Sequence, residues 1–316
     1  MDLWKKTDAK LKGKRISISF SGGRSSAVMT KLLYERYKES NEITILFANT
    51  GCEHEATLDF VEECDKQFEW GVVWLEALVS QTPGIGIKFK QVEYATASRN
   101  GEPFEDAIKK YGIYGPTNPS CTSRLKVEVF HRYLQSIGWE TGIKRDHFTA
   151  IGIRADEMDR VSSKFKEQML IYPLVDLGIR KRDVGLEIRK WGFDLGIPHD
   201  AYGNCVWCWK KSLRKLLTLA KENPSVFDFP ADMEKKYNTV KADAKAAGPD
   251  GKRYFFRKYR STADILEMSK TEKFIPYVDD AYEHGAAPGL FDGVGIMDEL
   301  DIGGGCGDGC EIGADE

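Results

Sequence analysis

The sequence predicts an α/β protein with a doubly wound, mostly parallel sheet and a helical C-terminal extension. Short apolar, β-branched segments alternate with helical patterns through the first half of the chain, which favours parallel strands with helices on both faces of the sheet. A turn rich in glycine and serine joins the first of these segments directly to a helical pattern. From about residue 224 onward the pattern is helical, polar and less regular.

The individual elements follow from local residue patterns. Clusters of apolar and β-branched residues predict strands at residues 15–20, 43–48, 72–78 and 147–153. Apolar residues at helical spacing predict helices at residues 27–37, 55–68, 122–137, 183–191 and 211–221. Between residues 80 and 120, glycine, proline and asparagine interrupt this rhythm around a short helix at 104–111. We expect this segment to be an insertion that covers a ligand site.

Length and composition predict a cytoplasmic protein of two parts. The 316 residues carry a net charge of −3, which gives no general attraction to nucleic acid or acidic membranes. No apolar run approaches the ~20 residues of a membrane helix, and the first six residues lack the apolar core of a signal peptide. We expect one domain over residues 1–222, insertion included, and a helical region over residues 223–316. The Gly-rich tail of that region, with Cys306 and Cys310, should be flexible.

The turn after the first predicted strand has the composition of a phosphate-binding loop. Residues 21–26 read S-G-G-R-S-S. Glycines let backbone amides approach an anion, the start of a helix adds unpaired N–H groups, and serine hydroxyls supply further donors. An ordinary turn with capping serines is the alternative, since neither the Walker A nor the dinucleotide-binding spacing is present. The predicted phosphate contacts are Ser21, Gly22, Gly23, Arg24, Ser25 and Ser26.

Three segments together resemble a known enzyme family. Residues 21–26 resemble the Ser-Gly-Gly-x-Asp-Ser PP-loop of ATP pyrophosphatases, with Ser25 where that family usually has Asp. Residues 49–57 (N-T-G-C-E-H-E-A-T) and 152–160 (G-I-R-A-D-E-M-D-R) resemble segments of its PAPS-reductase-like branch. All three follow predicted strands, at the carboxyl ends where open α/β sheets bind ligands. The resemblance implies a Rossmann-like sheet of the adenine nucleotide alpha-hydrolase type, with residues 1–222 as the PP-loop nucleotide-binding domain.

The same resemblance implies a site for ATP with Mg²⁺ or for another adenine nucleotide. Guanidinium groups bind phosphate through two parallel hydrogen bonds, and nearby carboxylates can hold Mg²⁺ beside phosphates. A solvated charged turn and helix capping are the alternatives for any single one of these residues. His54 is expected to start a helix rather than act as a base. Beyond the turn, the implied nucleotide contacts are Asn49, Thr50, Gly51, Glu53, Gly152, Arg154, Glu157 and Arg160, and Arg154 is also expected to act in catalysis.

Cysteine spacing predicts a metal or redox centre. Cys205 and Cys208 form a C-x-x-C, which can chelate one metal centre or form a redox pair. Cys121, followed by Lys126, resembles the cysteine loop that relatives place over the active site, and we expect both residues to act in catalysis. The resemblance implies a 4Fe-4S cluster held by Cys121, Cys205 and Cys208, with zinc as the alternative.

The remaining cysteines leave alternatives open. Ser120 stands where relatives have a second adjacent cysteine, so the fourth ligand position is either open or closed by Cys306 or Cys310. A tail with incidental cysteines is equally compatible with the sequence. Cys52 and Cys64 are expected to be small buried hydrophobic residues.

The implied function is ATP-dependent adenylation of an acceptor, followed by transfer of sulfur. A PAPS or adenylyl-sulfate reductase with a thiol nucleophile is one alternative, and a non-catalytic nucleotide-binding module is another, since Ser25 replaces the usual Asp. The expected partners are an adenine nucleotide, a sulfur donor or reductant protein, a nucleic-acid acceptor as one option, and a second copy of the chain in a homo-oligomer. The basic and aromatic run at 252–260 is the only local sign of nucleic acid, and a half-buried structural segment is its favoured interpretation.

Overall fold

Six strands form one sheet at the centre of the structure. The computed structural model describes residues 4–279. The strands lie in the order β4-β3-β2-β1-β5-β6, and neighbours pair in parallel except for β3 and β4. The predicted mostly parallel sheet is therefore confirmed. The strand bounds are β1 Arg15–Ser19, β2 Ile43–Asn49, β3 Val73–Val79, β4 Ile87–Val92, β5 His147–Ala150 and β6 Leu170–Ile171.

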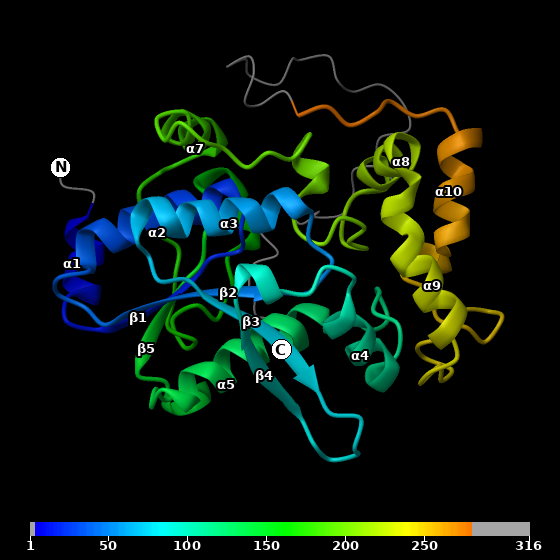
Figure 1. Ribbon diagram of the computed structural model, residues 1–316, viewed down its shortest axis with the longest axis horizontal. Helices are drawn as coiled ribbons and strands as arrows, with labels where there is room; N and C mark the ends of the chain where they lie inside the picture. The colour runs from blue at the N-terminus through cyan, green and yellow to red at the C-terminus, as the bar shows by residue number, and fades with distance from the viewer. Residues whose placement is uncertain (1–3, 280–316) are drawn as a thin grey trace.

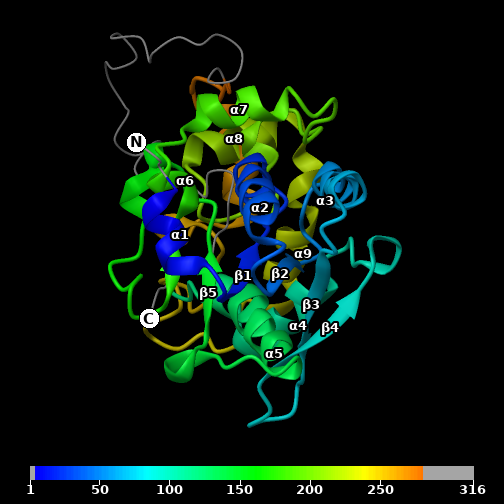
Figure 2. The same cartoon turned by 90° about the vertical axis from the view of Figure 1, so that its left-hand side faces the viewer.

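Helices cover both faces of this sheet. Helices α2 and α3 lie over one face, with α7 packed on α2, and helices α4 and α5 lie over the other (Figure 1 and, turned by 90°, Figure 2). The helix bounds are α1 Lys5–Leu11, α2 Arg24–Tyr37, α3 Glu55–Phe68, α4 Glu102–Tyr111, α5 Glu128–Ser136, α6 Pro173–Asp176, α7 Lys181–Ile188, α8 Leu213–Glu222, α9 Asp228–Tyr237 and α10 Thr262–Thr271.

Strand β1 occupies the middle of the sheet and is buried on both faces. Ile16 and Ile18 are fully buried, and Ser17 and Ser19, which point to the opposite face, are buried as well. Ile16 pairs with Ile43 of β2 on one side and with Phe148 of β5 on the other. Strands covered by helices on both faces are expected to be buried in this way. This position places the turn at residues 21–26 in the middle of the carboxyl edge.

The order of strands reverses between β1 and β5. From β1 the chain adds β2 and β3 on one side of the sheet, and it later returns to add β5 and β6 on the other side. The loops that follow β1 and β5 therefore leave adjacent strand ends in opposite directions. Open α/β sheets bind ligands in the crevice at such a reversal. Residues 21–26 and 152–160 are these two loops.

Residues 80–120 contain a strand that the sequence patterns did not reveal. Helix α4 confirms the short helix expected there, but β4 pairs antiparallel with β3 at the sheet edge. Ile87 and Val92 of β4 are buried, whereas Lys88 and Lys90 are exposed. Lysines on an edge strand discourage pairing with another chain. The alternation of buried and exposed residues in β4 is short and lies between turn-forming residues, so the sequence did not predict a strand there.

Helices α8, α9 and α10 form the helical C-terminal part of the described chain. Helix α10 packs against α8 and α9, and α9 packs against α4 of the insertion (Figure 1). Because α8 ends at residue 222 and α10 follows it, the two predicted parts share a packed interface. The boundary at residue 222 stays a prediction. Cys306 and Cys310 lie outside the described residues. Along residues 4–279, no helix combines the length and apolar character needed to cross a bilayer.

The close approach of the insertion to α9 gives a first prediction. Gly101 has a φ of +79°, and a Cβ added there would lie 2.2 Å from a ring carbon of Phe229. Gly101→Ala should therefore lower the free energy of unfolding by the cost of overpacking, about 1–3 kcal/mol, in addition to the cost of a left-handed alanine. Gly84→Ala is the matched control, because Gly84 has the same φ of +79° in the same insertion and nothing within 4 Å. Urea denaturation curves that shift equally for both variants would contradict the tight contact.

Glu234 of α9 predicts a dependence of stability on pH. Its two carboxylate oxygens accept hydrogen bonds from the backbone N–H groups of Phe255 (3.2 Å) and Thr262 (2.8 Å). Burial outweighs these bonds and raises the pKa of Glu234 from 4.5 to about 7. The folded state therefore holds this proton more tightly than the unfolded chain, so the contribution to stability is present below pH 4.5 and is lost as the pH rises through 7.

The corresponding variant removes this titration. A shift of that size corresponds to roughly 3 kcal/mol between the protonated and ionised forms. Glu234→Gln cannot ionise, so its free energy of unfolding should fall less steeply between pH 5 and 8 than that of the wild type. Urea denaturation at each pH measures both slopes, and parallel curves would show that Glu234 does not titrate in this range.

Candidate functional site

Glycine is required in the turn between β1 and α2. Gly22 has a φ of +78°, and a Cβ at this position would lie 2.6 Å from Thr57 Cγ2 and 3.0 Å from Val61 Cγ2. Gly23 is the N-cap of α2 and provides no side-chain cap for the first amides of the helix. Uncapped N–H groups at a helix start form a natural site for an anion.

Serine hydroxyls hold this turn closed. Ser26 Oγ accepts a hydrogen bond from Ser21 N (3.2 Å), donates to Gly23 O (2.9 Å) and lies 2.9 Å from Ser21 Oγ. Ser25 and Ser26 are both buried, whereas Ser21, Gly23 and Arg24 are partly exposed. Ser26 therefore shapes the turn, and the partly exposed side of the turn is the side that a phosphate can reach.

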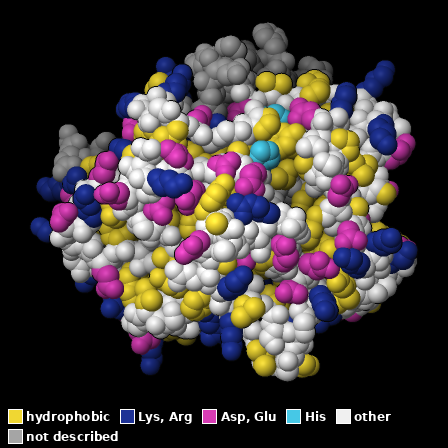
Figure 3. Space-filling model, in the orientation of Figure 1, with side chains coloured by type: hydrophobic (Ala, Val, Ile, Leu, Met, Phe, Trp, Pro, Cys, Tyr) yellow, Lys and Arg dark blue, Asp and Glu magenta, His cyan; other side chains and the backbone are white. Residues whose placement is uncertain are grey.

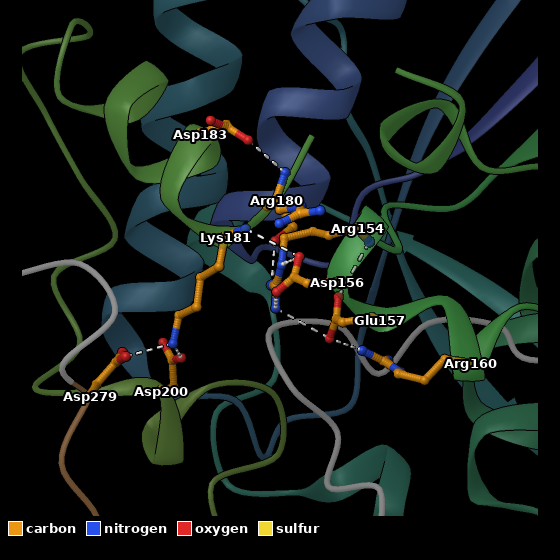
Figure 4. A network of polar contacts seen from close by, with 10 residues as sticks. Arg154, Asp156, Glu157, Arg160, Arg180, Lys181, Asp183, Asp200 and Asp279 are labelled. Atoms are coloured by element: carbon orange, nitrogen blue, oxygen red, sulfur yellow. Dashed lines mark hydrogen bonds and ion pairs between the residues drawn. The ribbon is translucent and has the colours of Figure 1, made fainter. Parts of the chain in front are cut away.

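Arg154 joins the two loops of the crevice. Its Nη1 donates a 3.0 Å hydrogen bond to Ser25 Oγ at the start of α2. Its Nε donates to Asp156 Oδ1 at 3.1 Å (Figure 4). The residue is only 6% exposed. Ser25 contributes a hydroxyl to this contact and adds no negative charge beside the guanidinium. The carboxylates beside Arg154 are instead those of Asp156 and Glu157, in its own loop.

Glu157 lies between two arginines in the loop after β5. Its Oε1 is 3.5 Å from Arg154 Nη2 and forms a short hydrogen bond with Arg160 Nη1 (Figure 4). Its Oε2 accepts a hydrogen bond from Arg154 N at 3.3 Å. Gly152 is buried directly after β5. The structure thus brings Arg154, Glu157 and Arg160 together, and the carboxylate of Glu157 orients both guanidinium groups.

Acidic residues that the sequence patterns did not single out surround Arg24. Arg24 Nε donates to Asp194 Oδ1 at 2.6 Å, and Arg24 Nη1 lies 3.9 Å from Asp200 Oδ1. Lys181 at the start of α7 pairs with Asp200 and Asp279 (Figure 4). Burial opposes ionisation of Asp200, but the hydrogen bond from Asp279 and the charge of Lys181 hold its pKa well below the ordinary value. These partners lie far from Arg24 in the sequence, and no local motif marks them.

A buried carboxylate organises the loop after β2. Glu53 accepts hydrogen bonds from Thr50 N (2.9 Å), Thr50 Oγ1 (2.9 Å) and Cys52 N (3.2 Å). Its Oε1 lies 3.9 Å from Lys126 Nζ, and its side chain is 1% exposed. Glu53 therefore anchors this loop, and most of its acceptor capacity is used within the protein.

Asn49 and Gly51 attach the insertion to the same edge. Asn49 Nδ2 donates to Glu76 Oε1 (2.7 Å) and to Ser98 O (2.8 Å), and Asn49 Oδ1 accepts from Gly51 N (3.1 Å). Glu76 in turn accepts hydrogen bonds from Ser98 N and Ser98 Oγ. The insertion is thus attached to Asn49, the last residue of β2, and to Glu76 of β3, and its role as a cover of the site stays a prediction.

His54 caps the next helix, as the sequence indicated. Its Nδ1 accepts a 3.2 Å hydrogen bond from Ala56 N at the start of α3. Burial lowers the pKa of His54, which favours the neutral ring that this acceptor role requires. This contact supports the interpretation of His54 as a structural residue.

Three cysteines line one cavity beside this loop. Cys121, Cys205 and Cys208 line a narrow cavity of about 20 Å³ together with Thr50 and Lys126. Thr50 Oγ1 lies 3.4 Å from Cys205 Sγ. Phe104, Trp207 and Trp209 form the aromatic walls of the cavity. The three cysteines therefore line one cavity next to Thr50, in the loop that follows β2.

Two local arrangements bring the cysteines there. Cys121 precedes a π-helical turn, Ser123–Val127, which leads into α5 and buries Lys126. Such turns are rare in proteins, and many of those that occur lie at functional sites. Cys205 forms an isolated antiparallel bridge with Glu53, and Val206 N donates to Cys52 O at 3.0 Å. The C-x-x-C is thus attached by its backbone to the loop after β2.

Comparison with known proteins agrees with this geometry. The model of the phosphoadenosine phosphosulfate (PAPS) reductase domain family matches residues 15–184. The chain belongs to this family. The match begins at β1 and runs through the loops after β1, β2 and β5 into α7. It therefore contains every segment that carried the resemblance, together with Cys121, but not Cys205 and Cys208.

Individual proteins that resemble this PAPS reductase family member share a third of its residues or fewer over the aligned segments. The nin region protein ORF290 of Escherichia phage lambda, described as uncharacterized, is 33% identical over 217 residues, which cover 65% of this chain and 69% of the relative. The uncharacterized protein MJ0066 of Methanocaldococcus jannaschii is 26% identical over 187 residues, 59% of this chain and 31% of the relative. The U34-tRNA thiolase NcsA from Methanococcus maripaludis, solved with its 4Fe-4S cluster, has a TM-score of 0.36 at 17% identity over 85% of this chain and 77% of its own.

Two cysteines outside the cavity and the basic run are structural. Burial, followed by the nearby Cys205 and Glu53, raises the pKa of Cys52 well above its ordinary value, and burial raises the pKa of Cys64. In the run at 252–260, Arg253, Phe255 and Phe256 are buried, so the favoured interpretation as a structural segment holds. The face shown in Figure 3 also intersperses basic and acidic side chains, without a broad patch of one sign.

The contacts of Glu53 give a prediction for the site. Glu53→Gln keeps only one acceptor oxygen and removes the negative charge beside Lys126, so the free energy of unfolding should fall by about 1–3 kcal/mol. Glu55→Gln is the control: Glu55 is 51% exposed in its pair with Arg99, and loss of such a surface pair costs about 0–1 kcal/mol. Equal shifts of the two variants in urea denaturation would contradict the anchoring role of Glu53.

Proposed function

We propose that this protein is an adenine-nucleotide-dependent sulfur-transfer enzyme, in which ATP activates an acceptor by adenylation and sulfur then displaces AMP. One observation carries the proposal. The thiols of Cys121, Cys205 and Cys208 share a cavity with Thr50 and Lys126, and Cys205 touches Thr50 on the carboxyl edge of the sheet. That edge is where this family's sheet type binds its ligand.

The crevice between β1 and β5 supports binding of the nucleotide. The uncapped start of α2 offers amide donors to phosphate oxygens. Arg154 and Arg160, held by Glu157, supply guanidinium groups of the kind that bind phosphate through paired hydrogen bonds. Mg²⁺ bound to ATP would offset part of the phosphate charge. These groups suit stabilisation of the negative charge that develops on the phosphates during transfer.

The proposed reaction has two steps. An acceptor oxygen of a carbonyl-like group attacks the α-phosphorus of ATP, and the bond to pyrophosphate breaks. A hydrosulfide from a sulfur-donor protein then attacks the activated carbon, the carbon–oxygen bond breaks, and AMP leaves with the oxygen. Lys126, buried beside Glu53 and the cavity, is positioned to stabilise the anionic sulfur or the departing phosphate. The aromatic walls exclude water, which would otherwise compete for the activated carbon.

The cavity suits an iron–sulfur cluster better than a zinc ion. Within residues 4–279, no three His, Cys, Asp or Glu side chains are arranged to hold a single metal ion. Zinc binds thiolates at about 2.3 Å and draws its ligands close together. A cluster brings its own sulfides and reaches thiolates that lie further apart. Cys121, Cys205 and Cys208 would hold it, and it would supply an iron position at which sulfide can bind.

The experiment that tests this function separates it from sulfonucleotide reduction. The full chain is purified without oxygen, analysed for iron, sulfide and zinc, and assayed for release of pyrophosphate from ATP and of sulfite from PAPS with thioredoxin. We expect iron and sulfide in the protein, and pyrophosphate release that depends on an acceptor. Sulfite release from PAPS without turnover of ATP would replace the proposal with the reductase. Nucleotide binding without either reaction, across acceptor nucleic acids and small carbonyl compounds, would leave a binding module.

Variants should separate the binding of ATP in the crevice from the transfer of sulfur at the cysteine cavity. Cys205→Ala should abolish sulfur transfer and leave the affinity for ATP unchanged. Arg154→Gln should weaken ATP binding roughly ten- to a hundredfold, because a hydrogen bond to a charged group contributes about 1.5–3 kcal/mol. Cys64→Ala is the control, because Cys64 is buried on α3 away from the cavity lining. Calorimetric titration with ATP measures the binding, and loss of ATP affinity in Cys205→Ala would contradict this division.

A further inference from the structure

A buried N–H donor beside the cysteine cavity has no partner. Trp209 lines the cavity and is 7% exposed. Its indole Nε1 is buried and makes no hydrogen bond with any of the residues that the structure describes. Buried polar groups without a partner are rare, and each calls for an explanation such as a bound ion or ligand. The indole nitrogen can only donate, so the missing partner is an acceptor.

A buried cation lies on the other side of the same loop. Lys211 is fully buried. Its ammonium donates hydrogen bonds to Gly203 O (2.8 Å) and Cys205 O (2.7 Å), the carbonyl groups that flank the start of the C-x-x-C. No Asp or Glu in the described part of the chain forms an ion pair with it. Carbonyl groups satisfy its hydrogen bonds but do not neutralise its charge, and burying an uncompensated charge is costly.

A second cation holds the end of this loop in place. Arg257 donates to Lys211 O (2.9 Å), Lys210 O (3.2 Å) and Trp209 O (3.4 Å). Lys211 thus binds carbonyl groups before Cys208 in the sequence, and Arg257 binds carbonyl groups after it. The loop therefore fixes Trp209 and the two thiols relative to one another, and the unpaired N–H group and the uncompensated charge both belong to this loop.

A single kind of ligand could both accept a hydrogen bond from Trp209 Nε1 and offset the charge of Lys211. Thiolates and inorganic sulfide are negatively charged, and their sulfur atoms accept hydrogen bonds. We propose that Trp209 and Lys211 stabilise the anionic sulfur of the group bound by Cys121, Cys205 and Cys208: Trp209 donates its indole N–H to a sulfur atom, and Lys211 offsets the charge of the thiolate ligands. This inference rests on the proposed function and assigns positioning roles to two residues that contact the ligands from outside.

The test uses the full chain reconstituted without oxygen with ferrous iron and sulfide. Trp209→Phe keeps an aromatic ring and removes the donor, and Lys211→Met keeps the length of the side chain and removes the charge. Each should bind iron roughly ten- to a hundredfold more weakly than the wild type, the usual cost of losing a contact around metal ligands, and an iron chelator should therefore bleach it faster. Each should also shift its redox equilibrium toward the oxidised cluster, because hydrogen bonds to sulfur and positive charge favour the reduced form. Lys211→Arg should restore the redox equilibrium.

Two controls separate these effects from loss of structure. Trp139→Phe removes an indole N–H that donates to Glu42 at 2.9 Å, away from the cavity. Lys110→Met removes the charge of another half-buried lysine, whose ammonium donates to Ser80 O (2.5 Å) and Thr82 O (3.3 Å) away from the cavity lining. Both should keep the bleaching rate and the redox equilibrium of the wild type, and circular dichroism monitors folding in every variant. Should Lys211→Met fail to fold, Trp209→Phe decides the matter alone.

The outcomes distinguish this inference from the proposed function. A wild type that takes up iron and sulfide, with Trp209→Phe bleached and reduced as readily as the wild type, overturns the inference and leaves the proposed function standing. A wild type that takes up neither iron nor sulfide overturns both. Faster bleaching of Trp209→Phe with a redox equilibrium shifted toward the oxidised form supports the hydrogen bond to sulfur.

Discussion

The carboxylate of Glu53 connects the parts of this site more than any other single group. It accepts hydrogen bonds from Thr50 and Cys52, which fixes the loop after β2, and it lies beside the ammonium of Lys126. Its own backbone pairs with Cys205. Segments about seventy and one hundred and fifty residues away are thereby held against one strand end. A buried charge of this kind is tolerated only with such partners, so the loop, the π-helical turn and the C-x-x-C must assemble together.

A second constraint acts across the reversal of strand order. Ser25 follows β1 and Arg154 follows β5, and their hydrogen bond closes the crevice between the two loops. Because β1 is the central strand, this crevice and the loop after β2 lie at neighbouring strand ends. The crevice between β1 and β5 thus depends on sheet topology, whereas the cysteine cavity depends on contacts between distant loops. Asn49 and Glu76 tie the insertion to β2 and β3, beside the loop that borders the cavity.

This difference explains how much the sequence could predict. Helix α3 spans the predicted residues 55–68 because its cap at His54 and its apolar stripe are local features, and the turn at 21–26 is equally local. Strand β4 escaped prediction because its alternation is short and lies between turn residues. The partners of Arg24 and the role of Lys211 could not be predicted, because each depends on groups brought together only by folding. Motif spacing named the three cysteines, but their common cavity required the structure.

Buried positive charges lie both at the crevice between β1 and β5 and beside the cysteine cavity. Lys126, Arg154 and Lys211 are 7%, 6% and 0% exposed, in a chain whose net charge is −3. The carboxylates of Glu53 and Asp156 accompany the first two, whereas Lys211 has only carbonyl groups in the described part of the chain. Burial of a positive charge without a neighbouring anion is costly, because desolvation costs several kcal/mol per ion. Among these three cations, Lys211 is therefore the one whose counter-charge is missing from the described residues, and anionic sulfur in the neighbouring cavity would supply it.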